Sequence, residues 1–202
     1  MRRPWAGPDS PRMFQNDFLD ALSRVHWAFV PLLYVPAVIW LGWTSFQKSD
    51  LSAAGFAGLY LAGIVIWTLT EYWLHRTFFH WIPKTSWGPK MHFLVHGVHH
   101  EWPHDRFRLV MPPAVSIPLF FLFLGLWSWI FEDKGWAVHA GFVTGYIVYD
   151  LTHYYVHHGR PKVRLLRKLQ GHHMSHHFNK RYLNKRFGVS SPLWDYVFGT
   201  RN

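Results

Sequence analysis

The chain has 202 residues, a length that fits one domain and leaves no room for a second substantial one. Half of its residues are hydrophobic and only 16% are charged, whereas charged residues supply about a quarter of a typical soluble domain. It contains no cysteine, which excludes disulfides, thiolate metal ligands and dithiol redox chemistry.

The formal net charge of +10 has two competing explanations. Basic proteins bind nucleic acid, or they lie against an anionic membrane surface. The hydrophobic residues of this chain are concentrated in long uncharged runs, which favours the membrane. We therefore expect the lipid bilayer as a partner and no nucleic acid.

Four hydrophobic stretches are predicted to be transmembrane helices. The first and the third contain no charged residue, and each is about long enough to cross a bilayer. Short polar links, QKSD and EDKG, join the stretches in pairs, so we expect two hairpins. Small residues such as Gly58 and Gly63 in the second stretch are expected to allow close helix contacts. The predicted spans cover about residues 27–46, 52–71, 112–131 and 136–152.

The basic residues predict how these hairpins are oriented. The hairpin tips hold only Lys48 and Lys134, which leaves 19 of the 21 basic residues on the other side. By the positive-inside rule, both termini and a helical cap formed by segments 72–111 and 153–202 are expected on the cytoplasmic side. The predicted fold is therefore all-α, multi-pass and integral to the membrane, as a single domain over residues 1–202. It would lie in a bacterial inner membrane or in the endoplasmic reticulum.

Histidines are concentrated on the predicted cytoplasmic side. The chain has 16, of which 13 fall into four groups. Of the other three, His26 and His139 are expected to be interfacial or packing residues, and His104 lies in a loop. The four groups are His75 and His80; His92, His96, His99 and His100; His153, His157 and His158; and His172, His173, His176 and His177.

The spacing within these groups predicts a metal site. Residues three or four apart share a face of a helix, and three of the groups contain such pairs. Neighbouring histidines, as at His99 and His100, differ by about 100° around a helix axis, so each could reach a different ion. His75 and His80 are five apart, and we expect them to lie on either side of a helix end. The doubled histidines are what a site for two metal ions requires.

Histidine nitrogens bind zinc, copper, iron and nickel, so the ligand type alone does not identify the metal. A structural zinc site needs four ligands, and at least ten histidines are present. Glu101 and His104 form the single Glu-x-x-His pair, whereas the carboxylate-rich di-iron site of four-helix bundles needs two, which argues against such a site. A non-catalytic metal-binding membrane protein is an alternative, although its histidines would be expected along the spans. In this chain the histidines lie at the ends of the spans, which favours an enzyme that uses O2 to modify a lipid.

The sequences around the histidines resemble one family of membrane enzymes. The strings HGVHHEWPHDRFRLVMPP, YDLTHYYVHHG and FGVSSPLWDYVFGT are similar to those of the fatty acid hydroxylase superfamily, and most similar to its fatty acid 2-hydroxylases. The resemblance extends from about Glu71 to Phe198. The histidine boxes alone are shared with other members, so a carotenoid or sterol hydroxylase or a desaturase stays an alternative.

This resemblance implies ten metal ligands, which are also the expected catalytic residues, and it leaves His92, His158 and His172 beside the site. One ion would bind His75, His80, His96, His100 and His176, and the other would bind His99, His153, His157, His173 and His177. The ions are expected to be iron, with zinc replacing them in some purified samples.

The resemblance also implies the reaction, in which one atom of O2 is inserted at carbon 2 of a fatty acyl chain of a lipid. Asp105, Arg106 and Arg108 are candidates to orient the headgroup, with a role as a solvated loop as the alternative. Too few residues precede the first span for a fused haem domain, so we expect a separate electron donor, similar to cytochrome b5 or a ferredoxin. Its expected docking residues are Arg160, Lys162, Arg164, Arg167, Lys168, Lys180, Arg181, Lys185 and Arg186.

Overall fold

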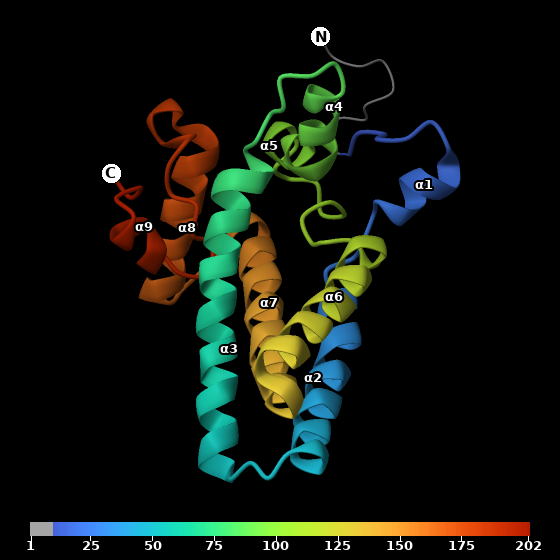
Figure 1. Cartoon of the computed structure of the whole chain (residues 1–202). Helices are drawn as coiled ribbons and strands as arrows, with labels where there is room; N and C mark the ends of the chain where they lie inside the picture. Colours follow the sequence, from blue (N-terminus) through green and yellow to red (C-terminus); the bar gives the residue numbers. More distant parts are fainter. Residues whose placement is uncertain (1–9) are drawn as a thin grey trace.

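The computed structural model describes residues 10–202, and within that range the chain is helical with no β-strand (Figure 1). Four long helices carry the fold, and shorter helices gather at one end. In chain order, the elements are α1 (Asp17–Leu22), α2 (Phe29–Lys48), α3 (Ala53–Trp73), η1 (Leu74–Phe79), α4 (Gly88–His92), η2 (Phe93–Gly97), α5 (Val98–Glu101), α6 (Pro113–Phe131), η3 (Glu132–Lys134), α7 (Gly135–His158), α8 (Arg164–Phe178), η4 (Lys180–Tyr182) and α9 (Leu193–Val197).

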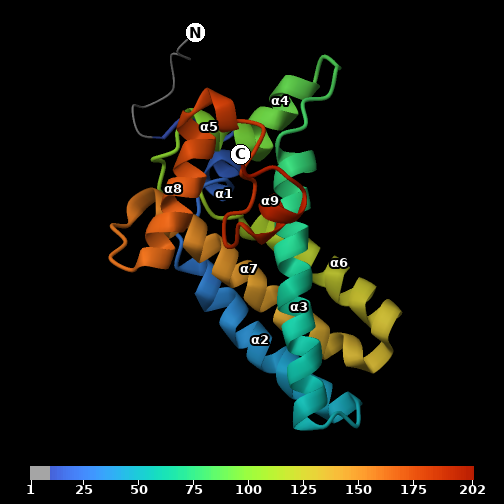
Figure 2. The ribbon, with the colours of Figure 1, turned by 90° about the vertical axis from the view of Figure 1, so that its left-hand side faces the viewer.

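Helix α7 is the centre of the bundle and packs against α2, α3 and α6 (Figures 1 and 2). Its contact with α3 is close because glycines lie between the two backbones. A Cβ on Gly63 would lie 2.1 Å from the carbonyl oxygen of Val138, and a Cβ on Gly141 would lie 1.8 Å from that of Tyr60. The predicted role of Gly63 is thus confirmed, whereas a Cβ on Gly58 would meet nothing within 4 Å.

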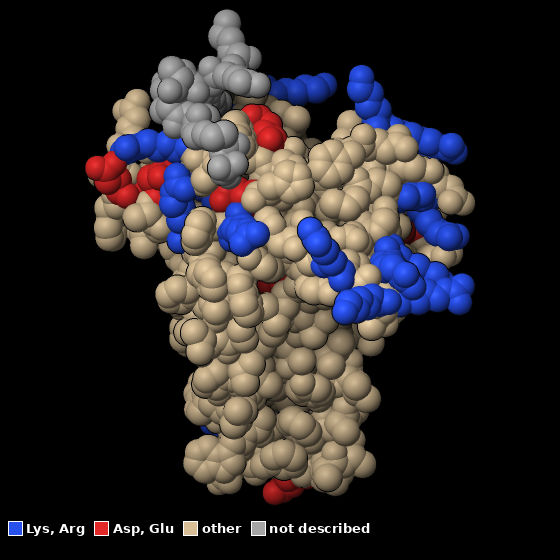
Figure 3. Space-filling model, turned by 180° about the vertical axis from the view of Figure 1, so that it is seen from behind, with Lys and Arg blue, Asp and Glu red and all other residues tan. Residues whose placement is uncertain are grey.

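Three helical stretches are long and hydrophobic enough to cross a membrane: Phe29–Lys48, Ala53–Phe79 and Pro113–His158. The third contains both α6 and α7, which turn back on each other at η3 (Figure 1). Figure 3 shows that the surface around the long helices is almost free of charged side chains, which gather at the end with the short helices. An all-α protein integral to the membrane is therefore confirmed.

The fourth long helix differs from its predicted extent. Helix α7 continues to His158 instead of ending near residue 152, so His153 and His157 belong to its last turns and not to a separate cap segment. Likewise, α3 passes into η1 without a break. Two of the long helices therefore reach into the cap and carry histidines with them.

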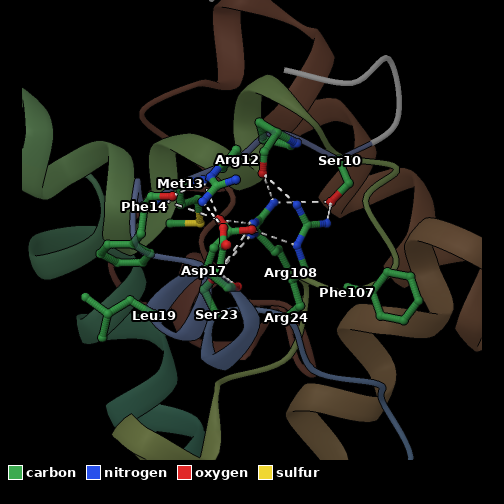
Figure 4. Close-up of polar contacts among 12 residues, drawn as sticks. Ser10, Arg12, Met13, Phe14, Asp17, Leu19, Ser23, Arg24, Phe107 and Arg108 are labelled. Atoms are coloured by element: carbon green, nitrogen blue, oxygen red, sulfur yellow. Dashed lines mark hydrogen bonds and ion pairs between the residues drawn. The ribbon is translucent and has the colours of Figure 1, made fainter. Parts of the chain in front are cut away.

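The N-terminal segment is tied to the loop after α5 by a buried ionic network (Figure 4). Arg108 donates to the carboxylates of Asp20 at 3.0 Å and Asp105 at 3.3 Å, and Ser10 donates to Asp105 at 2.7 Å. Arg108 and Asp105 are only 8% and 3% exposed. The expectation that Asp105 and Arg108 orient a headgroup is therefore wrong, because their charges are used against residues far away in the sequence. Arg106, by contrast, is exposed.

Candidate metal centre

A first cluster of histidine rings lies between η1, η2, α5 and α8. One nitrogen from each of five rings lies within 4.8 Å of the corresponding nitrogen of every other ring. The Nε2 atom of His96 is 3.1 Å from that of His75 and 3.0 Å from that of His100, and His80 and His176 approach to 3.1 Å. The cluster consists of His75, His80, His96, His100 and His176.

His75 and His80 lie on either side of a helix end, as expected, because η1 ends at Phe79 and His80 follows it. Residues 74–79 form a π-helical turn that continues α3. Hydrogen bonds in a π-helix join residues five apart, so the side chains of His75 and His80 lie on the same face, with 5.1 Å between their ring centroids. A second π-helical turn, η2, carries His96. A spacing of five thus brings ligands together here.

A second cluster of five rings lies between α5, α7 and α8, and all of its members are buried. The Nε2 atom of His173 is 2.9 Å from that of His157 and 3.1 Å from that of His177, and those of His153 and His99 are 3.0 Å apart. As the spacing predicted, the pairs four apart on α7 and α8 share a face. The cluster consists of His99, His153, His157, His173 and His177.

Two of the four doubled histidines are divided between the two clusters. His99 belongs to the second and His100 to the first, and the same holds for His177 and His176. The clusters adjoin, because the rings of His100 and His177 stack with 4.2 Å between their centroids. The structure thus brings together the two groups of five that the resemblance implied. Their role as metal ligands stays a prediction.

The distances between the nitrogens fit a metal ion at each cluster. Two nitrogens at about 2.1 Å from one ion lie roughly 3.0 Å apart when they bind at right angles, and roughly 3.4 Å apart in a tetrahedral site. Six pairs of Nε2 atoms are 2.9 to 3.1 Å apart. These distances, with five rings in each cluster, fit the nitrogens of one metal ion.

The surroundings keep these rings neutral, which is the form that binds a metal. Burial, and then the proximity of other histidines, holds the pKa of His96, His99 and His173 well below the usual range. The same causes lower the pKa of His80 to about 3 and that of His100 to about 2. A proton on any ring would be buried among its neighbours without an opposite charge, so the lone pairs stay available to a cation.

Two rings of the first cluster are also fixed by backbone carbonyls. The Nδ1 atom of His75 lies 2.6 Å from the carbonyl oxygen of Phe187, and that of His176 lies 2.7 Å from the carbonyl oxygen of Lys185. A carbonyl can only accept, so both Nδ1 atoms carry the proton. The Nε2 lone pairs therefore face the cluster, as a metal ligand requires.

The histidines beside the clusters have other contacts. His172 lies 3.0 Å from the carboxylate of Asp195, and the ring of His92 packs against Gly97. The ring of His158 lies 4.8 Å from that of Tyr154. Of the lone histidines, His139 is fully buried with its ring 4.7 Å from that of Phe120, which agrees with the packing role expected for it.

Sequence reasoning missed two buried carboxylates near the first cluster. Asp195 is fully buried and Glu71 is 3% exposed, and both accept hydrogen bonds from the backbone of residues 187–190. Glu71 lies four residues before His75, a spacing that places the two on one helix face and could have indicated it. Nothing in the sequence indicates a role for Asp195, because it lies outside every histidine group.

Below the clusters, the long helices line an apolar hollow of about 40 Å³. It lies among α2, α3, α6 and α7. Leu74, one of its lining residues, directly precedes the first-cluster residue His75. The other lining residues include Tyr34, Trp67, Met111, Phe120 and Phe142.

Comparison with known proteins gives consistent results. The fatty acid hydroxylase family matches residues 60–200. The dihydroceramide fatty acyl 2-hydroxylase FAH1 of Arabidopsis thaliana is 39% identical over 201 residues, which cover 99% of this chain and 84% of that protein. The fatty acid 2-hydroxylase of Rattus norvegicus is 37% identical over 212 residues, covering 94% of this chain and 56% of that protein.

A solved structure shares the fold. It is described as full-length scs7p with only the hydroxylase domain visible, and it superposes with a TM-score of 0.87 at 34% identity, covering 96% of this chain and 72% of that one. The match extends over the long helices and the cap alike. This chain belongs to the fatty acid hydroxylase family.

Proposed function

We propose that this protein hydroxylates carbon 2 of a fatty acyl chain in a membrane lipid, using O2 and two iron ions held by the histidine clusters. The observation that carries the proposal is the pair of five-histidine clusters, spaced for metal binding at the head of a hydrophobic bundle. The names of the relatives, which describe fatty acid and dihydroceramide fatty acyl 2-hydroxylases, support carbon 2 as the position.

The proposed chemistry assigns distinct tasks to the metal and to the chain. Bound iron would supply the activation of O2, which no amino-acid side chain can provide. The chain holds ten neutral rings in place and excludes water, since His173 and His176 are fully buried. Only His80 and His100 are part exposed among the ten, so we place the access of substrate and electrons on their side.

Carbon 2 lies next to the carbonyl carbon, so a substrate must keep its polar head in the cap while its chain lies in the membrane. The hollow among the long helices holds only about 40 Å³, but its lining is hydrophobic and aromatic. We propose that the acyl chain enters there by displacing these side chains. Changing the size of a lining residue should then shift the accepted chain length, since Phe142→Ala enlarges the hollow and Val143→Trp narrows it.

The reaction is tested with the purified chain, loaded with Fe(II), reduced, and supplied with an acyl lipid and isotopically heavy O2. Mass spectrometry of the released acyl chains should show one heavy oxygen at carbon 2. Hydroxylation of a carotenoid or sterol ring, or desaturation without oxygen at carbon 2, would assign the protein to another branch of the family. A chain that binds metal without any turnover would support a non-catalytic role.

We further propose four spans with the cap on the cytoplasmic side. The hydrophobic surface in Figure 3 and the 19 basic residues away from the hairpin tips support this orientation. Because the chain has no cysteine, single cysteines can be introduced and labelled without background. Cysteines at Ser49 and Asp133 should react from the side opposite to one at Arg160, and reaction from the same side would refute the orientation.

The electron donor is proposed to be a separate acidic protein, similar to cytochrome b5 or a ferredoxin, that docks on the basic residues around α8. Figure 3 shows Lys and Arg side chains gathered on one side of the cap end. Arg186 turns inward, where it donates to Ser175 and to the carbonyl of Arg201, so it is the least suited of the nine. Anionic lipid would compete for the others. Turnover should fall with salt and with Arg167→Glu, and insensitivity to both would contradict docking there.

A further inference from the structure

Residues 185–187 form a turn that holds the first cluster from the side of the C-terminal segment. The carbonyls of Lys185 and Phe187 accept hydrogen bonds from His176 at 2.7 Å and from His75 at 2.6 Å. Arg186 lies between them with a φ of 61°, a left-handed conformation that residues other than glycine rarely adopt. The surrounding structure must therefore hold this turn in place.

Asp195, on α9, is one of the groups that hold it. One carboxylate oxygen accepts from the backbone amide of Phe187 at 2.9 Å and from the hydroxyl of Thr200 at 2.7 Å. The other accepts from the amide of Gly188 at 2.9 Å and lies 3.0 Å from Nε2 of His172. Each oxygen thus has two donors, and the carboxylate is fully buried.

Glu71, on α3, holds the next two residues of the same segment. One of its oxygens accepts from the amides of Val189 at 2.6 Å and Ser190 at 2.8 Å. The other accepts from the hydroxyl of Ser190. Glu71 also lies four residues before His75, on the same turn of helix. That turn therefore carries His75 together with the carboxylate that holds the segment whose Phe187 carbonyl accepts from His75.

We propose that Glu71 and Asp195 are positioning residues of the first metal site. They hold the backbone of residues 187–190 so that the carbonyl of Phe187 keeps His75 in the tautomer and orientation that ligate. They touch neither the ions nor the substrate. The inference rests on the proposed metal site at the first cluster, and it assigns these two carboxylates no part in the second.

The two carboxylates respond differently to the same loss of charge. An amide has one accepting oxygen, and its nitrogen can only donate. Asp195→Asn therefore loses the hydrogen bond from the amide of Phe187 or from that of Gly188 in either orientation, because its nitrogen then faces a backbone N–H group. Glu71→Gln loses none, because its oxygen can accept from both backbone amides while its nitrogen donates to the hydroxyl of Ser190. A role in geometry predicts a difference between these variants, whereas a role in charge predicts similar effects.

The experiment titrates the purified full chain in detergent with Co(II), whose visible absorption reports its ligands, and measures the affinity of each site. We expect Asp195→Asn to weaken one of two sites by about 10- to 100-fold, the usual effect of losing a group that orients a ligand. Glu71→Gln should bind like the original chain. Glu71→Leu, which removes the acceptors, should resemble Asp195→Asn.

The controls separate this role from general stability. Asp20→Asn removes a buried, hydrogen-bonded carboxylate far from the histidines and should leave both sites unchanged. If Asp195→Asn does not fold, Thr200→Val removes one of its four donors and should weaken the same site less. Equal effects of Asp195→Asn and Glu71→Gln, unchanged affinity in Asp195→Asn, or equal weakening of both sites would overturn the proposal. An original chain that binds no Co(II) would instead refute the metal site itself.

Discussion

The two histidine clusters contain the same number of rings but are held in different ways. In the first, His75 and His176 donate to carbonyls of the C-terminal segment, and three rings come from π-helical turns or their ends. In the second, the Nδ1 atoms of all five rings have no hydrogen-bond partner among residues 10–202. Those rings are oriented by regular helices and by packing.

The difference separates a site that depends on a loop from one that depends on the bundle. The second cluster takes four of its rings from α7 and α8, in pairs four residues apart. The first also has the two part-exposed rings, His80 and His100. We therefore expect the first site to respond to changes in residues 185–190 and to solvent, and the second to respond to changes in helix packing.

The largest effect should follow from removing a ligand. His173 approaches two other rings of the second cluster, so His173→Ala should abolish hydroxylation, a larger loss than the 10- to 100-fold typical of groups that only orient a ligand. Metal analysis should find one ion per chain in place of two. His26→Ala, which changes an exposed histidine outside both clusters, is the control. Activity retained in His173→Ala would remove it from the proposed site.

Metal exchange should separate the two sites. A chelator reaches the first cluster past His80 and His100, whereas every ring of the second is buried. Release of metal from the loaded chain should therefore occur in two phases of equal amplitude. In Asp195→Asn only the faster phase should accelerate. Release in a single phase would show that the difference in exposure does not control access.

A smaller effect on metal affinity should follow from changing the backbone conformation at residue 186, independently of the contacts of its side chain. Both Arg186→Asn and Arg186→Val lose the contacts of the guanidinium group with Ser175 and the carbonyl of Arg201. Asn tolerates a positive φ, and a β-branched residue does not. We expect Arg186→Val to bind metal at the first site about 10-fold more weakly than Arg186→Asn. Similar affinities would show that the backbone conformation there does not position His75 and His176.

The comparison also shows why one cluster was more predictable than the other. The pairs in the second cluster lie four apart on regular helices, which spacing in the sequence reveals. The face shared by His75 and His80 depends on a π-helical turn, and nothing in their spacing distinguishes that turn from a helix end. The carbonyls of Lys185 and Phe187 are backbone groups that every residue carries. Arg108 pairs with Asp20, 88 positions away, so its burial had no local signal either.

The hydrophobic runs predicted the long helices because the membrane selects for length and lack of charge. The ends were less predictable, since α3 and α7 continue into the cap. The last turns of these helices no longer follow the hydrophobic pattern, and they carry histidines that pack against one another. The histidine clusters therefore begin where the hydrophobic runs end.

The smallest expected effect concerns acid and the metal-free chain. Folding lowers the pKa of His80 to about 3 and that of His173 well below the usual value, whereas both titrate near pH 6.5 when unfolded. The unfolded chain therefore binds more protons below about pH 6.5, and the stability of the fold decreases as the pH falls. The melting temperature of the metal-free chain should drop between pH 7 and pH 5, and metal should reduce the drop.

The same argument predicts where the two clusters diverge. Down to about pH 5 neither ring is protonated in the folded state, so His80→Asn and His173→Asn should flatten the pH dependence equally. Below about pH 4 the folded chain begins to protonate His80 but not His173, so the contribution of His80 to the fall in stability begins to level off while that of His173 continues. Melting curves of the two variants, taken from pH 7 to pH 3.5, should therefore coincide in slope and then separate. A separation already present at pH 6 would contradict the view that both clusters hold their rings neutral, and would place a proton on the first cluster near neutral pH.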